Sequence, residues 1–291
     1  MLTFKKVELE DSETLRAALL KYDKRVCDYS AGNIIFWRDY YGISYCLDDD
    51  GLVLKYDSVD LKRCYSFPVS DEPIRLIEKI LKASKSDVCL TCLTEEQLLI
   101  VKNSFNVVDV IHTEDFDDYL YLAKNMVELA GRRYCGQRNH INKFKKLYAD
   151  FCFEEITKDN AAQAKEFCHR YFNGIGKNTA VSDVEYKQLV EQFDNWEGYN
   201  QLGGMLKVDG TVIGISVGEI VGDTLIVHTE KADTSYQGAY PMLTNLFAKT
   251  FVNEQCRFIN REEDCGEEGL RISKRSYHPI EMLKKYAVII K

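Results

Sequence analysis

The chain has 291 residues, of which 45% are hydrophobic and 29% are charged, and its formal net charge is −8 at pH 7. This composition is typical of a globular protein, and the length favours two domains over one. The acidic balance argues against general attraction to nucleic acid or to anionic membranes. No apolar run approaches the roughly 20 residues of a membrane span, and the N-terminus lacks a signal-peptide core. We therefore expect a cytoplasmic protein with no membrane span.

The ten cysteines are scattered along the chain, which shows no export signal, so we expect reduced thiols. Cys89 and Cys92 form a C-x-x-C pair, a spacing that suits zinc or redox chemistry. The sequence holds no second C-x-x-C pair and no paired histidines, and this pair ends an apolar strand. We interpret both as buried structural cysteines and predict no metal site.

The first third of the chain predicts a strand, two helices, three antiparallel strands, a helix, a strand and a helix. Asp50-Gly51 between two apolar runs is typical of a hairpin. Periodicity and caps place the elements as follows: strand 2–8, helices from Ser12 and from about Ala31 to Tyr40, strands 43–47, 52–56 and 61–67, a helix around Ile74 to Leu81, strand 87–93 and helix 94–101.

The last part of the chain repeats this order. The elements are strand 151–156, a helical pattern at 161–171, helix 183–193, two strands around the turn Asp209-Gly210, a strand at 225–227, a helix through Leu243 and Phe251, strand 258–259, helix 267–276 and strand 286–290. A repeated element order suggests a tandem duplication. We predict an N-terminal domain at 1–124, a basic linker at 125–150 that is helical over about 125–148, and a C-terminal domain at 151–291 that carries the site. Gly131 and Gly136 are candidates to interrupt the linker helix.

The stretch from Asp223 to Tyr277 concentrates the polar candidates. An apolar strand turns polar at His228 and Glu230, and after a helix a second strand ends in the run Asn260 to Asp264. A strand, helix, strand unit predicts two parallel strands with a right-handed connection. Their polar ends should therefore emerge at one edge of the sheet, where open α/β sheets bind ligands.

The element order resembles the GNAT-type N-acyltransferase fold, and several motifs point to one family. They are His228-Thr229-Glu230-Lys231-Ala232-Asp233, Gly238-Ala239-Tyr240-Pro241, Ile259-Asn260-Arg261-Glu262-Glu263-Asp264, Gly269-Leu270-Arg271 with Lys274 and Ser276-Tyr277, and the upstream run Gln137 to Phe144. They resemble the bacterial family of unknown function related to the C-terminal domain of phosphatidylglycerol lysyltransferases. The resemblance implies a mixed α+β and α/β fold of two tandem GNAT-like domains, each a mostly antiparallel mixed sheet flanked by helices.

The better understood relatives transfer an aminoacyl group from charged tRNA to an amine or hydroxyl of a lipid or peptide. Because no membrane span is visible here, the resemblance does not extend to a phosphatidylglycerol substrate. Acetyl-CoA enzymes of the fold carry a Q/R-x-x-G-x-G/A loop, whose backbone N–H groups and following helix receive the pyrophosphate. Aligned on Gly238, this chain has Ser235 and Tyr240 at the outer positions, and Pro241 removes a donor. These departures weaken the prediction of coenzyme A binding but do not exclude it. Acyl-CoA and aminoacyl-tRNA are therefore the two candidate donors.

Each candidate side chain has a functional and a structural interpretation. Glu230 and His228 lie two apart on a strand and so share a face. Glu230 would be the general base for an attacking amine with His228 assisting, and Tyr277 would be a general acid toward the leaving group. The alternatives are structural hydrogen bonds at a strand end and a core aromatic.

The remaining candidates would bind anions. Arg261, among Asn260, Glu262 and Asp264, suits a carboxylate or phosphate, or else an internal ion pair. Arg271 and Lys274 share a helix face that would meet an anionic ligand or solvent. On the linker, a basic face is either a surface for tRNA or another polyanion, or simply solvated. It comprises Arg138, Asn142, Lys145 and Lys146.

These patterns predict a transferase that moves an acyl or aminoacyl group onto an amine of a small-molecule or peptide acceptor. The alternative is a noncatalytic module on the duplicated fold that binds an anionic metabolite or a peptide.

Overall fold

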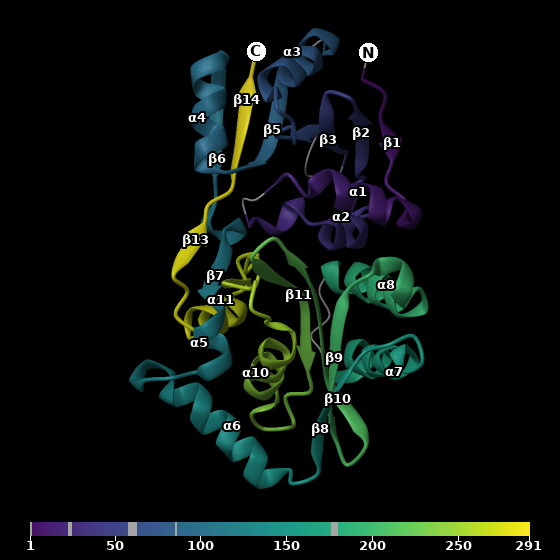
Figure 1. Ribbon diagram of the computed structural model, residues 1–291, viewed down its shortest axis with the longest axis vertical. Helices are drawn as coiled ribbons and strands as arrows, with labels where there is room; N and C mark the ends of the chain where they lie inside the picture. The colour runs from purple at the N-terminus through teal and green to yellow at the C-terminus, as the bar shows by residue number, and fades with distance from the viewer. Residues whose placement is uncertain (1, 23–24, 58–62, 85, 176–179) are drawn as a thin grey trace. The chain divides into compact units, whose positions relative to one another are not determined.

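The computed structural model describes residues 2–22, 25–57, 63–84, 86–175 and 180–291 (Figure 1). Contacts divide the chain into two compact units. Unit 1 comprises Met1–Tyr119, Glu263–Arg271 and Met282–Lys291, and unit 2 comprises Leu120–Glu262 and Ile272–Glu281. Each unit is therefore built from segments distant in the sequence. The predicted domain boundaries at residues 124 and 150 stay a prediction about the tandem duplication.

Unit 1 is built on a seven-stranded mixed sheet in the order β1-β2-β3-β4-β5-β14-β6. Its strands are β1 (Lys5–Lys6), β2 (Ser44–Asp48), β3 (Gly51–Tyr56), β4 (Cys64–Ser66), β5 (Val88–Leu93), β14 (Tyr286–Ile290) and β6 (Val107–His112). The neighbours β2, β3 and β4 pair antiparallel as predicted, and β4 and β5 pair parallel. Residues 61–62 of the predicted strand 61–67 lie outside the described residues.

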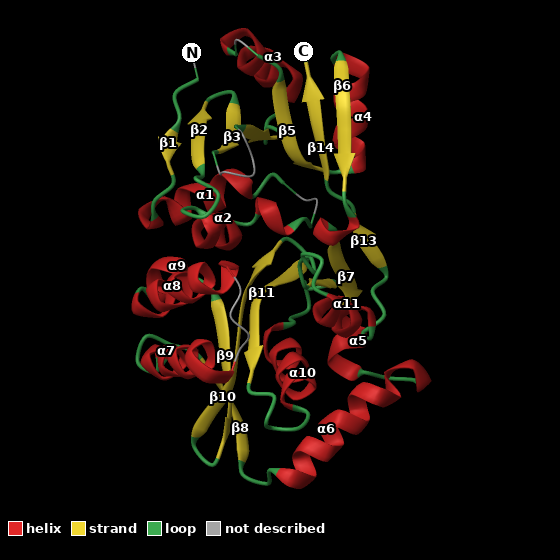
Figure 2. Cartoon of the chain, turned by 180° about the vertical axis from the view of Figure 1, so that it is seen from behind, coloured by secondary structure: helices red, strands yellow, loops and turns green. Residues whose placement is uncertain are grey.

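The same unit contains helices α1 (Ser12–Leu19), α2 (Ala31–Trp37), α3 (Pro73–Ala83) and α4 (Glu95–Ser104) (Figures 1 and 2). Sequence signals explain two of their starts. Pro73 occupies the first turn of α3, where its missing N–H costs nothing. Thr94 and Gln97 form a reciprocal capping box at the start of α4. Leu76, Ile77 and Ile80 of α3 pack with Leu98 and Val101 of α4 against the sheet.

The second sheet has the order β13-β7-β12-β11-β10-β9-β8. Its strands are β13 (Glu281–Leu283), β7 (Asp118–Leu122), β12 (Phe258–Asn260), β11 (Thr224–Ala232), β10 (Thr211–Val221), β9 (Leu202–Val208) and β8 (Phe151–Glu155). The hairpin predicted at Asp209-Gly210 joins β9 to β10, and both turn residues have positive φ. The last strand of the chain, β14, pairs with β5 and β6 of the first sheet instead.

Helix α10 (Ala239–Phe251) contacts β9, β10 and β11, and α7 (Ala161–Arg170) contacts β10 and α8 (Ala180–Asp194). Figure 1 shows α10 on one side of these strands and α7 and α8 on the other. A π-helix covers Tyr171–Ile175, and α9 (Trp196–Tyr199) precedes β9. The last helix is α11 (Glu268–Arg275). Two mixed sheets flanked by helices confirm the predicted fold class.

The predicted linker helix is divided. Helix α5 (Ala123–Glu128) ends at Leu129 in the left-handed conformation, a 3-10 turn covers Arg132–Tyr134, and α6 (Cys135–Leu147) follows. Gly131 lies in the interruption with φ +84°, whereas Gly136 lies inside α6. Leu129 and Gly131 have positive φ, which a right-handed helix cannot contain. The chain therefore changes direction between α5 and α6.

Candidate functional site

The site predicted between two parallel strands lies where β11 and β12 part. Strand β12 pairs parallel with β11 only through Thr224–Phe258, Leu225–Ile259 and Ile226–Asn260, which confirms the predicted parallel unit. Beyond these pairs, β11 continues to Ala232, whereas β12 has ended and the segment that begins with Arg261 diverges from β11. Two charge pairs bridge the resulting split: His228 with Glu262, and Glu230 with Arg261.

His228 sits at a bulge in β11. The register with β10 shifts so that Val217 pairs with Thr229 and Gly218 pairs with Val227, which leaves His228 as the extra residue. Its Nδ1 lies 2.7 Å from Glu262 Oε1, and its Nε2 lies 3.1 Å from Glu219 Oε1 on β10. Burial alone would lower the pKa of His228, but these two carboxylates raise it to about 9. His228 is therefore a positively charged imidazolium near neutral pH. In this form it holds the two carboxylates and does not accept a proton.

Glu230 faces a different set of partners from His228. Its Oε2 accepts hydrogen bonds from Arg261, with Nε at 3.1 Å, and its Oε1 accepts from the Thr244 hydroxyl of α10 at 2.6 Å. Both side chains of the pair are about nine-tenths buried, at 10% and 8% exposed. Burial would lower the pKa of Arg261, but Glu230 raises it. Arg261 therefore stays charged.

Tyr277 completes this group. Its ring lies beneath the Arg261 guanidinium, with the carbon of the guanidinium 5.0 Å from the ring centroid. Burial raises the pKa of Tyr277 to about 12, although Arg261 opposes the shift. The phenol therefore stays protonated near neutral pH and can donate a hydrogen bond.

One buried polar atom at this point lacks a partner. Arg261 Nη1 has no hydrogen-bond partner among the described residues. Arg261, Glu230 and Thr244 line one end of a pocket with an empty volume of about 210 Å³, whose other walls are apolar: Met126, Leu225, Val227, Phe247, Ala248 and Ile259. The space inside it that a water-sized sphere can occupy is only about 10 Å³, which is room for about one water.

Asn260 and Glu262 form the turn after β12. Asn260 is fully buried, and its Oδ1 accepts the backbone N–H of Glu262 at 2.6 Å. Glu262 itself has φ +56°, an unusual conformation for this residue type. The Asn260 side chain thus supports the strained turn that presents Glu262 to His228.

Asp264 and Arg271 lie in unit 1 and bind each other. Arg271 donates from Nε and Nη2 to the two oxygens of Asp264 at 3.0 and 2.8 Å, and also contacts Asp115. Burial would raise the pKa of Asp264, but Arg271 and the Tyr119 hydroxyl lower it to about 2. Arg271 thus forms an internal ion pair, which neither of its two interpretations from sequence included. Lys274 belongs to unit 2, where its side chain is buried and its carbonyl accepts from Tyr121 at 2.8 Å.

The basic linker residues divide into one structural and three exposed members. Arg138 donates to the carbonyls of Leu129 and Gly131, which closes the end of α5. Asn142, Lys145 and Lys146 are exposed on α6, whose opposite face buries Ile141 and Phe144. A solvent-facing basic surface therefore exists on α6 without Arg138.

The turn before α10, where a coenzyme A pyrophosphate would bind, is closed by α6. A Cβ on Gly238 would lie 2.6 Å from the carbonyl oxygen of His140. The N–H of Gln237 donates to the Tyr148 hydroxyl at 3.1 Å, and the N–H of Ala239 donates to Tyr236. Since Pro241 has no N–H, most of the donors that would cradle a pyrophosphate are already used or missing.

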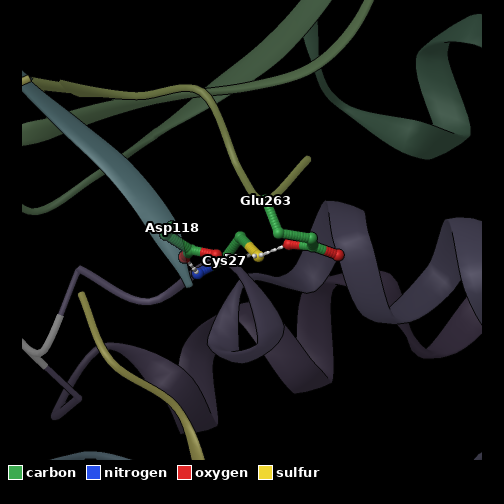
Figure 3. A group of neighbouring side chains, drawn as sticks. All are labelled: Cys27, Asp118 and Glu263. Atoms are coloured by element: carbon green, nitrogen blue, oxygen red, sulfur yellow. Dashed lines mark hydrogen bonds between the residues drawn. The ribbon is translucent and has the colours of Figure 1, made fainter. Parts of the chain in front are cut away.

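Unit 1 contains a buried charged cluster that the sequence did not reveal. Ligand atoms of Cys27, Asp118 and Glu263 lie within 4.8 Å of one another (Figure 3). Lys285 Nζ lies among them, 2.9 Å from Asp118 and 3.1 Å from Glu263, and 2.9 Å from Asp28. The ammonium group of Lys285 therefore fills the position that a cation would take. The available sequence signal for this cluster was Lys285, a charged residue directly before the final apolar strand.

The sequence also missed Glu219, a charged residue inside the otherwise apolar strand β10. It is 2% exposed and contacts His228. Its isolation among apolar neighbours was the signal, since buried carboxylates require a partner.

Two mixed sheets flanked by helices, with the second sheet split between β11 and β12, agree with the predicted tandem GNAT-like fold. A family model described as phosphatidylglycerol lysyltransferase, C-terminal, matches residues 20–289, and the chain belongs to this family. Among the residues that the structure describes, no helix is long and apolar enough to cross a bilayer.

Three proteins similar to this chain can be compared with it. A conserved protein of unknown function from Bacteroides thetaiotaomicron is 31% identical, with 100% of both chains covered and a TM-score of 0.91. An uncharacterized protein of Mycoplasmoides gallisepticum is 26% identical over 199 residues, which is 67% of this chain and 63% of that protein, so the match spans less than two thirds of its length. The structure of L-PGS from Bacillus licheniformis has a TM-score of 0.65 at 13% identity, covering 99% of this chain and 94% of that one.

Proposed function

We propose that this protein transfers an aminoacyl group from a charged tRNA to an amine of a small-molecule or peptide acceptor. The observation that carries the choice of donor is the closed turn before α10, where Gly238 packs on the His140 carbonyl. A coenzyme A thioester would lose its usual pyrophosphate contacts there. An aminoacyl-tRNA does not need them.

In the proposed reaction the acceptor nitrogen attacks the ester carbonyl carbon. The new C–N bond forms, the C–O bond to the ribose breaks, and the ribose oxygen leaves with a proton. Glu230 accepts the proton of the amine at Oε1, the oxygen that faces Thr244 instead of Arg261. Arg261 Nη1 donates to the carbonyl oxygen as its negative charge develops. Tyr277 passes a proton to the leaving oxygen.

His228 has a positioning role in this proposal. Its two carboxylate contacts fix the arms of the split, and Asn260 fixes the turn that carries Glu262. The buried Lys274 adds positive charge to unit 2. We keep Asp264 and Arg271 as the pair that orders the following helix.

The test measures transfer from a panel of charged tRNAs and acyl-CoA thioesters to primary amines. We expect transfer from tRNA, reduced on the order of 10²–10³-fold in Arg261→Lys, which lacks a bidentate fork, and in Glu230→Gln. Glu155→Gln, at an exposed glutamate of β8, is the matched control. Transfer from acyl-CoA alone would overturn the donor, and full activity of Glu230→Gln would remove that residue as base.

The exposed face of α6 would contact the tRNA backbone. The double variant Lys145→Ala/Lys146→Ala should weaken tRNA binding and flatten its salt dependence by about 0.7–0.9 in log–log slope per lost contact. Lys249→Ala, at an exposed lysine of α10, is the control. Equal tRNA affinity of both variants would place the nucleic acid elsewhere.

A binding module is the second candidate, and the internal pairing of the charges favours it. His228, Glu230 and Arg261 already neutralise partners within the protein. A thermal-shift screen of anionic metabolites and peptides distinguishes the two functions. A ligand that raises the Tm but is never consumed with any charged tRNA supports the module.

A further inference from the structure

Two cysteines face each other across neighbouring parallel strands of unit 1. Cys64 of β4 and Cys89 of β5 are direct register partners. Residues paired in this way point to the same face, and strands lie about 4.8 Å apart. Disulfides form where Cα atoms are about 4.4–6.8 Å apart. The backbone thus already holds the two thiols at a separation that a disulfide can bridge.

The two thiols differ in exposure and acidity. Cys64 is buried, at 4% exposed, whereas Cys89 is only partly buried. The neighbouring Cys89, together with burial, raises the pKa of Cys64, and the proximity of Cys64 lowers the pKa of Cys89. A thiolate is the form that reacts with oxidants. Because Cys89 is the more exposed of the two, it is the sulfur that an oxidant reaches, and Cys64 is the one that resolves the product.

Cys92, the other member of the C-x-x-C motif, is directed elsewhere. Residues three apart on a strand point to opposite faces. Cys92 has φ +57°, and its thiol donates to Asp28 Oδ1 at 3.1 Å. Burial raises the pKa of Cys92 well above its usual value. The partner of Cys89 is thus found across the sheet and not along the motif.

We propose that Cys89 and Cys64 form a reversible thiol-oxidation site that reacts with hydroperoxides. The Cys89 sulfur attacks the peroxide, an S–O bond forms, the O–O bond breaks, and the leaving oxygen takes a proton to give water and a sulfenic acid. The Cys64 sulfur then attacks the Cys89 sulfur, the S–S bond forms, the S–O bond breaks, and a second water leaves. One peroxide is reduced and two thiols are oxidised. An external dithiol reverses the change and becomes a disulfide itself.

The disulfide would join two strands of the sheet that pair over a short length. Strand β4 has three residues and pairs with β5 through three residue pairs only. The bond would close the loop that contains α3, which restricts the unfolded chain. Oxidation should therefore raise the Tm of the protein by several degrees.

The experiment treats the full-length protein with equimolar hydrogen peroxide, blocks free thiols and maps tryptic peptides without reduction. Cys64 lies in peptide 64–75, and Cys89 shares peptide 86–102 with Cys92. We expect these peptides cross-linked in the wild type and in Cys92→Ser, and separate in Cys89→Ser. In Cys64→Ser, the sulfenic acid should persist on Cys89 and react with dimedone.

The exposed Cys135, Cys152 and Cys265 are internal comparators. We expect Cys89 to be oxidised several-fold faster than these, and a dithiol to restore the original peptides and Tm. A cross-link that survives in Cys89→Ser, or that disappears in Cys92→Ser, would overturn the pairing. Oxidation of the comparators before Cys89 would overturn the selectivity. The wild-type map requires no variant to fold.

Discussion

At the scale of single residues, the predicted site is a set of matched charges. His228 lies between two carboxylates, and Glu230 lies between Arg261 and Thr244. The sequence predicts both His228 and Glu230 as reactive groups. In the structure each also compensates a buried charge, which would otherwise cost several kcal/mol.

The raised pKa of His228 predicts a pH-dependent stability. Because the pKa rises from 6.5 in the unfolded chain to about 9 in the folded one, its contribution is fully present below about pH 6.5 and is lost as pH rises through 9. The contribution is on the order of 3 kcal/mol. Urea unfolding should show that His228→Gln loses most at about pH 6 and little at about pH 10. The exposed His140→Gln should show no such dependence.

The Glu230–Arg261 pair should show strong energetic coupling. Arg261→Gln leaves Glu230 buried without its cation, and we expect a loss of about 3–5 kcal/mol in the free energy of unfolding. The double variant Glu230→Gln/Arg261→Gln removes both charges and should be less destabilised than the sum of the single variants. Simple additivity in chemical denaturation would show that the pair is not coupled.

At the scale of elements, α6 determines what α10 can bind. In other proteins a helix N-terminus preceded by a glycine-rich turn is a phosphate site. Here Gly238 brings the turn against the His140 carbonyl, and Tyr148 takes the N–H of Gln237. The linker therefore blocks the turn before α10. This contact becomes visible only when α6 and α10 are considered together.

Gly238→Ala tests this packing. The residue has φ +88°, and its new Cβ would lie 2.6 Å from the His140 oxygen and 3.2 Å from the Phe144 Cβ. Gly210→Ala is the matched control, because Gly210 has φ +74° and nothing within 4 Å of a new Cβ. Both variants lose about 1 kcal/mol to positive φ, and Gly238→Ala should lose a further ~1–3 kcal/mol to the clash. Equal losses in denaturant unfolding would contradict the close contact.

At the scale of the whole molecule, the end of the chain completes the unit that its beginning forms. Strand β14 lies between β5 and β6, and Lys285 anchors it in the acidic cluster of Asp28, Asp118 and Glu263. Burial would lower the pKa of Lys285, but the carboxylates raise it. Burial also raises the pKa of Asp118 to about 6, against the effect of Lys285.

Lys285→Met should destabilise the protein by about 3–5 kcal/mol near neutral pH, because the buried Asp118 and the half-buried Asp28 and Glu263 lose their cation. The loss should shrink as pH falls below about 6, where Asp118 takes up a proton. The neighbouring exposed Lys284→Met is the control and should be nearly neutral. A loss independent of pH would show that packing and not charge explains the effect.

The sequence by itself determined most of the elements and the chemistry available at their ends, although it did not predict β6, β7 or β13. Apolar periodicity and caps gave the strands and helices, and the polarity change after Val227 located the split, because these signals are local. Tertiary structure alone decided the pairings. The bulge made His228 the extra residue of β11, Arg271 bound Asp264, and β14 paired in the first sheet. Such partnerships depend on long-range backbone geometry and on burial, which a single sequence does not encode at any fixed spacing.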